Sequence, residues 1–118
     1  MSRAARLARG RWAERLAAWS LRLRGYRVLA RRYRTPVGEI DLVVRRGRLL
    51  AFVEVKARPD LDQALAALGP RQQARTRRAA EWFLLRHPQH ADCVLRFDLV
   101  AIEPWRLPRH LADAWRLE

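Results

Sequence analysis

The chain has 118 residues, 50% of them hydrophobic, which excludes a disordered protein and is enough for one small core. Its 25 lysines and arginines against 12 aspartates and glutamates give a net charge of +13. This charge favours a polyanionic partner, nucleic acid first and an anionic membrane or ribosome surface second. A GC-rich genome is an alternative source of an arginine-rich composition, and it would carry no function.

The cysteine content and the apolar runs indicate a cellular compartment. Cys93 is the single cysteine, so no intrachain disulfide forms, and a reducing cytoplasm fits. Neither a signal peptide nor a membrane span is recognisable. We therefore expect a cytoplasmic protein with one domain over residues 1–118 and no membrane partner.

A helix is predicted over residues 3–24. Its large apolar side chains recur at helical spacing and predict the side that faces the core: Trp12, Leu16, Trp19 and Leu23. A second stripe lies about half a turn away: Leu7, Ala17 and Leu21. Glu14 falls among these residues as the acid of the helix, and it either pairs with an arginine or reaches toward the hairpin that follows.

Three strands are predicted next. Gly25 is typical of a helix end, and residues 26–33 form the first strand. Residues 39–44 and 49–56, joined by the polar segment 45–48, predict a β-hairpin with a loop of two or four residues and with Val44 opposite Leu49. Alternation then places one set of side chains on a common face: Glu39, Asp41, Phe52, Glu54 and Lys56. The other face carries Ile40, Leu42, Val44, Ala51, Val53 and Val55.

The hairpin brings two carboxylates together. Asp41 and Glu54 become diagonal neighbours with Cβ atoms roughly 7–8 Å apart, near enough to bind one ion. Unpaired carboxylates repel each other, and ligation by oxygen alone favours Mg²⁺ or Mn²⁺. Lys56, on the same face, would orient a water or offset charge on a phosphate. The alternative is an ordinary surface salt-bridge cluster of the same three residues.

A second helix is predicted from Pro70 to about Arg86, because proline is favoured in the first turn of a helix. The preceding residues 60–68 form either a short helix or a loop. Gln72 is an inward amide of the first turn, which hydrogen-bonds a site water or phosphate or else only caps and packs. Arg71 and Arg75 belong to an arginine-rich face that is either solvated or in contact with a phosphodiester.

The remaining elements are a buried strand and a terminal helix. Residues 93–102 are nearly continuously apolar and predict a strand parallel to a neighbour, with Arg96 and Asp98 pairing on one face. Residues 107–115 suggest a short final helix. The spacing of His87 and His90 is a weak signal for a zinc site.

In this order of elements the chain resembles the PD-(D/E)XK nuclease superfamily. It is more closely similar to the YraN family of small bacterial proteins, which are related in fold to Holliday junction resolvases. The resemblance covers nearly the whole chain and rests on these segments: Gly38-Glu39-Ile40-Asp41-Leu42-Val43, Phe52-Val53-Glu54-Val55-Lys56-Ala57-Arg58, Pro70-Arg71-Gln72-Gln73 with Ala79-Ala80, and Arg96-Phe97-Asp98-Leu99-Val100. It implies a restriction-endonuclease-like α/β domain of order αβββαβ(α), with a mixed central β-sheet flanked by helices.

The resemblance also implies roles for particular residues. Asp41 and Glu54 would bind the divalent ion with the carbonyl of Val55, while Lys56 positions the attacking water. Glu14 matches an acid of the first helix that related nucleases often add to the metal shell. The chain departs from the pattern at Gln72, where similar sequences commonly carry a lysine. The expected supporting or nucleic-acid-binding residues are Glu39, Arg58, Gln72, Gln73, Arg71 and Arg75.

Together these observations predict a metal-dependent endonuclease that hydrolyses phosphodiester bonds in structured or branched nucleic acid. DNA is favoured over RNA, Mg²⁺ or Mn²⁺ is the expected cofactor, and a homodimer is left open. One alternative is a non-catalytic nucleic-acid- or ribosome-binding module that keeps the nuclease fold. Another is a structural interaction protein whose charge reflects its genome.

Overall fold

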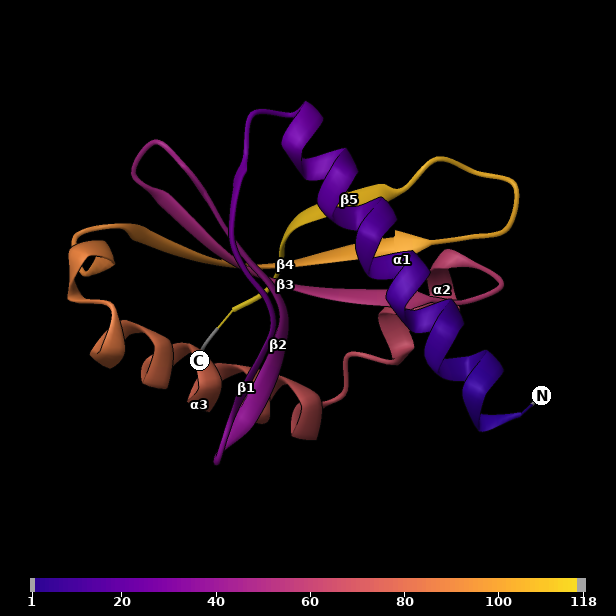
Figure 1. Ribbon diagram of the computed structural model, residues 1–118, viewed down its shortest axis with the longest axis horizontal. Coiled ribbons are helices and arrows are strands. Elements are labelled where there is room, and N and C mark those ends of the chain that lie inside the picture. The colour runs from indigo at the N-terminus through magenta and orange to yellow at the C-terminus, as the bar shows by residue number, and fades with distance from the viewer. Residues whose placement is uncertain (1, 117–118) are drawn as a thin grey trace.

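A five-stranded mixed sheet forms the middle layer of the molecule, in the spatial order β1-β2-β3-β4-β5 (Figure 1). The computed structural model describes residues 2–116, and the side chains of residues 2–4 and 10–116. The strands are β1 (Arg27–Thr35), β2 (Gly38–Arg46), β3 (Leu49–Ala57), β4 (Val94–Ile102) and β5 (Arg109–Trp115). The helices are α1 (Arg3–Leu23), α2 (Leu61–Ala66), α3 (Pro70–Arg86) and the 3₁₀ turn η1 (Pro88–His90). Strands β3 and β4 are parallel, and the other neighbours are antiparallel.

Helices α1 and α3 cover opposite faces of this sheet (Figure 1). Alternation along β3 supplies both cores, since Ala51 and Val53 pack on the α1 side while Leu50 and Phe52 pack on the α3 side. The prediction of an α/β fold with a mixed central sheet flanked by helices is confirmed. Within residues 2–116 no helix is long and apolar enough to cross a membrane.

The face that α1 presents to the sheet differs from the predicted one. Its buried residues are mainly small: Ala13, Ala17, Ala18, Ser20 and Leu21. The predicted core stripe is instead largely exposed, with Trp12, Trp19 and Leu23 at 58%, 51% and 69%. Small side chains let a helix backbone approach a sheet closely, so the alanine face packs on the sheet despite the greater apolar area of the tryptophans. The side chain of Leu7 lies outside the described residues.

The predicted helix over residues 107–115 is wrong, because the chain forms strand β5 antiparallel to β4. A buried carboxylate explains the strand. Asp98 is fully buried in β4, and it accepts hydrogen bonds from the Asp113 amide at 2.9 Å and from the Arg96 guanidinium at 2.7–2.8 Å. The ring nitrogen Nε2 of His110 lies 2.8 Å from the same carboxylate. Strand β5 therefore supplies partners that a buried charge needs, and the predicted Arg96–Asp98 pair is confirmed.

These contacts also set the ionisation of Asp98. Burial favours the neutral carboxyl, but hydrogen bonds from His110, Arg96 and the Asp113 amide outweigh it and lower the pKa of Asp98. The pair therefore remains charged inside the sheet and fixes β5 against β4.

The hairpin of β2 and β3 has the shorter of the two predicted loops, but Val44 has a different partner from the predicted Leu49. Val44 pairs with Ala51, and Arg46 pairs with Leu49, so only Gly47 and Arg48 remain in the loop. Gly47 has a φ of 59°, a conformation that glycine adopts without strain. The register differs from the predicted one by an even number of residues, so the predicted alternation of β3 is kept, and Glu54 and Lys56 both lie on the α3 side.

Strand β2 separates from β3 at Leu42. Its pairing with β3 ends at Leu42 and Val53, whereas its pairing with β1 continues to Gly38. At this fork Ile40 joins the α3-side core while Leu42 joins the α1-side core, so the prediction that they share a face is wrong. The backbone of β1 is irregular at the same level, since Arg32, between the Arg31–Leu42 and Tyr33–Ile40 pairs, has a φ of 48°.

The tip of the β1–β2 hairpin contacts the backbone of α3 at Gly38. A Cβ atom at this position would collide with the carbonyl oxygen of Arg75. Gly38→Ala should therefore destabilise the fold by about 2–3 kcal/mol, since neither backbone can yield cheaply. Urea denaturation followed by circular dichroism measures this change.

Gly10 provides the matched control. It lies inside α1, and a Cβ atom added there would have no neighbouring atom within 4 Å, so Gly10→Ala should stabilise the protein by about 0.5–1 kcal/mol. Equal effects of the two substitutions would contradict the close approach at Gly38.

Candidate functional site

The fork between β2 and β3 positions the side chain of Asp41. The Asp41 Oδ2 atom accepts a hydrogen bond from the Val55 amide at 2.8 Å. Since β2 no longer pairs with β3 at this level, the carboxylate takes the place of a strand carbonyl. Asp41 is thus held at the edge of β3, beside the residues that follow Val53.

Glu54 is the buried acid of the site. Only 3% of it is exposed, and its Oε1 atom accepts a hydrogen bond from the Thr76 hydroxyl of α3 at 2.9 Å. Burial raises the pKa of Glu54 from 4.5 to about 9, helped by the charge of Asp41 and a hydrogen bond between the two carboxyl groups. Thr76 and Lys56 act in the opposite direction and do not cancel this effect. Without a bound cation, Glu54 is therefore protonated at neutral pH.

Lys56 and Gln72 complete this group of side chains. The Lys56 ammonium lies 3.5 Å from the Gln72 Oε1 atom, which belongs to the first turn of α3. The ammonium is close enough to Glu54 for its charge to lower the pKa of that carboxyl. Gln72 therefore takes a third role that the sequence did not indicate, since its amide oxygen orients the lysine.

Glu14 reaches the neighbourhood of Asp41 from α1. It accepts a hydrogen bond from the Arg32 Nε atom at 2.7 Å, so it does pair with an arginine, although the partner is in β1. Glu14 and Asp41 also line one cavity of about 170 Å³. The lining residues are Gly10, Arg11, Glu14, Arg32, Arg34, Glu39, Ile40 and Asp41.

The other predicted site residues contact partners outside the Asp41–Glu54 pair. Glu39 is exposed and lies 3.7 Å from Arg34 at the rim of the cavity. The Gln73 amide donates to the Leu68 carbonyl at 2.9 Å and so holds the connection between α2 and α3. Arg71 and Arg75 are exposed on α3. Arg58 follows β3 and donates to the Ala57 carbonyl at 2.8 Å.

The donor atoms of the site suit a small, hard cation. Among residues 2–116 no three His, Cys, Asp or Glu side chains gather into a metal cluster. Asp41 and Glu54 alone remain as a carboxylate pair, and Mg²⁺ is commonly held by one or two carboxylates, with waters and substrate phosphates as the other ligands. A buried carboxyl beside a second one requires either a proton or a cation. These residues therefore fit Mg²⁺ or Mn²⁺.

The two histidines after α3 are occupied elsewhere. The His87 Nδ1 atom lies 2.9 Å from the Phe83 carbonyl, and the His90 Nδ1 atom lies 2.7 Å from the Arg45 guanidinium. Both rings stack on Phe83. They pack against the core, so this segment adds nothing to the candidate site.

Sequence reasoning missed Thr76 and Arg32. Thr76 had a weak signal, because it is a hydroxyl on the inward side of α3, four residues after Gln72. Arg32 had none, since its position depends on the irregular backbone opposite Asp41. Both residues act on site carboxylates through a single hydrogen bond.

A family sequence model decides where the chain belongs. The model described as "Uncharacterised protein family UPF0102" matches residues 13–102. The chain is a member of the UPF0102 family. A UPF0102 protein of Parvibaculum lavamentivorans is 66% identical over 104 residues, which is 88% of this chain and 78% of that protein. One from Paramagnetospirillum magneticum is 54% identical over 114 residues, covering 93% and 88% of the two chains.

The UPF0102 match spans the whole candidate site. It runs from α1 to the end of β4 and so contains Glu14, Asp41, Glu54, Lys56 and Thr76. Strand β5 lies outside the matched residues. The site is therefore built from the part of the chain that defines this family.

Glu54→Gln tests the buried carboxyl. The folded protein favours protonated Glu54, so its contribution to stability is fully present below pH 4.5 and is lost as the pH rises toward about 9. Glutamine is neutral throughout and can still hydrogen-bond Asp41 and Thr76. Glu54→Gln should therefore stabilise the metal-free protein at pH 7, by up to about 3 kcal/mol, and have little effect near pH 4.5.

Urea denaturation over this pH range, with a chelator present, measures the difference. Glu39→Gln is the control, because the Glu39 side chain is 55% exposed and should give a profile parallel to the wild type. If Glu54→Gln also ran parallel to the wild type, Glu54 would be an ordinary ionised carboxylate.

Proposed function

We propose that this UPF0102 protein is a metal-dependent nuclease with a restriction-endonuclease-like domain of the PD-(D/E)XK type, as its resemblance to the YraN family implies. One observation carries the proposal: Glu54 is buried beside Asp41 and has a pKa raised to about 9, with a lysine on the same side of the sheet. A purely structural site would favour an apolar residue there, because a buried acid pair costs stability. The expected substrate is structured or branched nucleic acid, DNA rather than RNA.

The chain's own residues suit phosphodiester hydrolysis. Asp41 and Glu54 would hold Mg²⁺ or Mn²⁺, and Glu54 would give up its proton on doing so. When bound, the cation would polarise a phosphoryl oxygen and lower the pKa of an attacking water. Lys56, oriented by Gln72, would donate a hydrogen bond to that water or to the phosphate.

The surroundings of the site suit a polyanionic substrate. Arg71 and Arg75 are exposed along α3, the helix that also supplies Thr76 and Gln72. With a net charge of +13, the protein would attract nucleic acid through its phosphates, and binding should weaken as the salt concentration rises. This attraction is independent of sequence, so selection of a branched substrate requires further contacts.

A cleavage assay tests the proposal. Purified protein with Mn²⁺ or Mg²⁺ should cut labelled junction or flap DNA, and Asp41→Asn and Lys56→Met should each lower the rate at least about a hundredfold. Glu39→Gln is the control and should retain activity, because the Glu39 side chain is 55% exposed and pairs with Arg34 rather than with Asp41 or Glu54. Equal traces of cleavage by the wild type and by Asp41→Asn would indicate a contaminant and refute the proposal.

The second candidate is a non-catalytic nucleic-acid- or ribosome-binding module. One observation favours it: Glu14 is already paired with Arg32, and a proton satisfies Glu54 without any cation. Calorimetric titration with Mn²⁺ separates the candidates. The nuclease should bind Mn²⁺ with release of a proton at pH 7, and Glu54→Gln should abolish both signals.

The binding module makes the opposite prediction. It should bind nucleic acid with a steep salt dependence that neither Mn²⁺ nor Asp41→Asn changes. Failure to bind at low salt would leave both candidates without support.

A further inference from the structure

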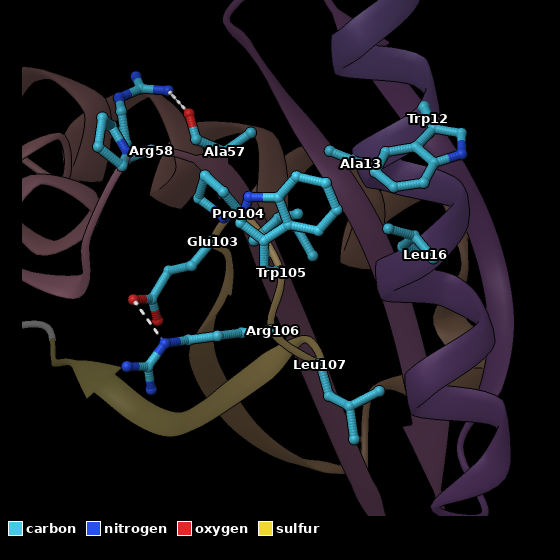
Figure 2. A pocket seen from close by; sticks show the side chains of 12 residues that line it. Trp12, Ala13, Leu16, Ala57, Arg58, Glu103, Pro104, Trp105, Arg106 and Leu107 are labelled. Carbon is cyan, nitrogen blue, oxygen red and sulfur yellow. Dashed lines mark hydrogen bonds and ion pairs between the residues drawn. The ribbon is translucent and has the colours of Figure 1, made fainter.

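A large pocket lies between α1, the end of β3 and the loop that joins β4 to β5. Its volume is about 760 Å³. Trp12, Ala13 and Leu16 line it from α1, residues 57–59 from the end of β3, and residues 102–107 from the loop (Figure 2). We call it the tryptophan pocket. It lies on the α1 side of the sheet, whereas Glu54 contacts α3 on the other side.

Two tryptophans expose their rings at this pocket. Trp105 is fully exposed and Trp12 is 58% exposed. Trp105 also has a φ of 62°, a conformation that is costly for a bulky side chain. Apolar side chains held in solvent at such a cost mark a binding surface, because neither packing nor local structure explains them.

The charge of the pocket selects a polyanion. Arg58 and Arg106 belong to its lining, and Glu103 is the one acid among the lining residues. The Glu103 carboxylate is already paired with Arg109 at 3.1 Å, so the exposed Arg106, 3.9 Å from Glu103, adds positive charge in excess. A second copy of this chain docked through the same patch would bring like charges together, so the pocket is poorly suited to a symmetric dimer.

Indole rings beside arginines are the elements that bind single-stranded nucleic acid. Every base has a π-face that stacks on an aromatic ring, and the arginines neutralise the phosphates between bases. The pocket also lies next to the candidate site in the chain. Arg58 follows Lys56 by two residues, so both surfaces meet the chain at the carboxyl end of β3.

We propose that the tryptophan pocket binds unpaired nucleotides, with bases stacked on Trp105 and Trp12 and phosphates held by Arg58 and Arg106. This inference rests on the proposed function and specifies its substrate class, namely nucleic acid with an unpaired segment beside the bond to be cut. The carboxyl end of β3 then serves both surfaces, with Lys56 turned to the acid pair and Ala57 to the pocket.

Fluorescence anisotropy with labelled oligonucleotides tests the pocket. Three probes are compared in a chelating buffer: a thymidine 12-mer, an abasic 12-mer with the same phosphates, and a matched duplex. Trp105→Ala and Trp12→Ala should each weaken binding of the thymidine strand about fivefold or more, and leave binding of the abasic strand unchanged. Arg58→Ala should weaken all probes and reduce the salt dependence by about one phosphate contact.

Trp19→Ala is the matched control. Trp19 lies on the same helix, is 51% exposed and does not line the pocket, so this variant should bind like the wild type. Trp105→Phe should retain most of the affinity, since phenylalanine also stacks. An equal loss for Trp19→Ala, or no loss for Trp105→Ala, would overturn the proposal.

Two further measurements test whether the pocket instead binds a second copy of the chain or a lipid. If Trp105→Ala converted a dimer to a monomer in size-exclusion chromatography, the pocket would be an interface between copies. If Trp105→Ala weakened binding to phosphatidylglycerol vesicles and not to thymidine, it would be a lipid site. Either result would overturn the proposal.

These measurements need no metal, so they separate the two proposals. If bases stack in the tryptophan pocket but the protein cleaves no DNA, the nuclease proposal is refuted and the pocket proposal stands. Cleavage that depends on Asp41 but is insensitive to Trp105→Ala would retain the nuclease and refute the pocket.

Discussion

The hydrogen bond from the Val55 amide to the Asp41 carboxylate depends on the separation of β2 from β3. Were the strands paired along their full length, a β2 carbonyl would take that amide and Asp41 would have no place at the edge of β3. The fork instead keeps β2 paired with β1 and turns Ile40 into the α3-side core. This local departure from regular pairing thus places the Asp41 carboxylate against the Val55 amide, and the residue before Val55 is the second acid, Glu54.

Because Asp41 lies there, the protonation state of Glu54 is the dominant electrostatic feature of the site. Burial between the sheet and α3 would be tolerable for a neutral acid, and Thr76 provides the matching hydrogen bond. The adjacent Asp41 adds repulsion, so a proton or a cation must offset the charge. Lys56 does not supply that offset alone, since its charge lowers the pKa of Glu54 without restoring the ordinary value.

Much of this site was predictable from the sequence because strand alternation survives an error of register. The hairpin, the common side of Glu54 and Lys56, and the inward position of Gln72 all follow from periodicity. Three features did not. The side switch at Ile40 accompanies the separation of β2 from β3, the alanine face of α1 depends on close packing, and β5 depends on the buried charge of Asp98. Each is a tertiary effect that overrides a local pattern.

The error on α1 has a functional meaning. The stripe of tryptophans and leucines predicted the core because large apolar side chains are normally buried, yet alanines pack on the sheet and leave Trp12 and Trp19 in solvent. With these side chains exposed, the fold lacks the stabilisation that their burial would provide. The β4–β5 loop repeats the pattern, since Trp105 projects fully into solvent from a strained backbone. Two separate segments therefore present aromatic rings at one pocket, beside the end of the strand that carries Glu54 and Lys56, and an unpaired base accounts for both exposures with a single contact.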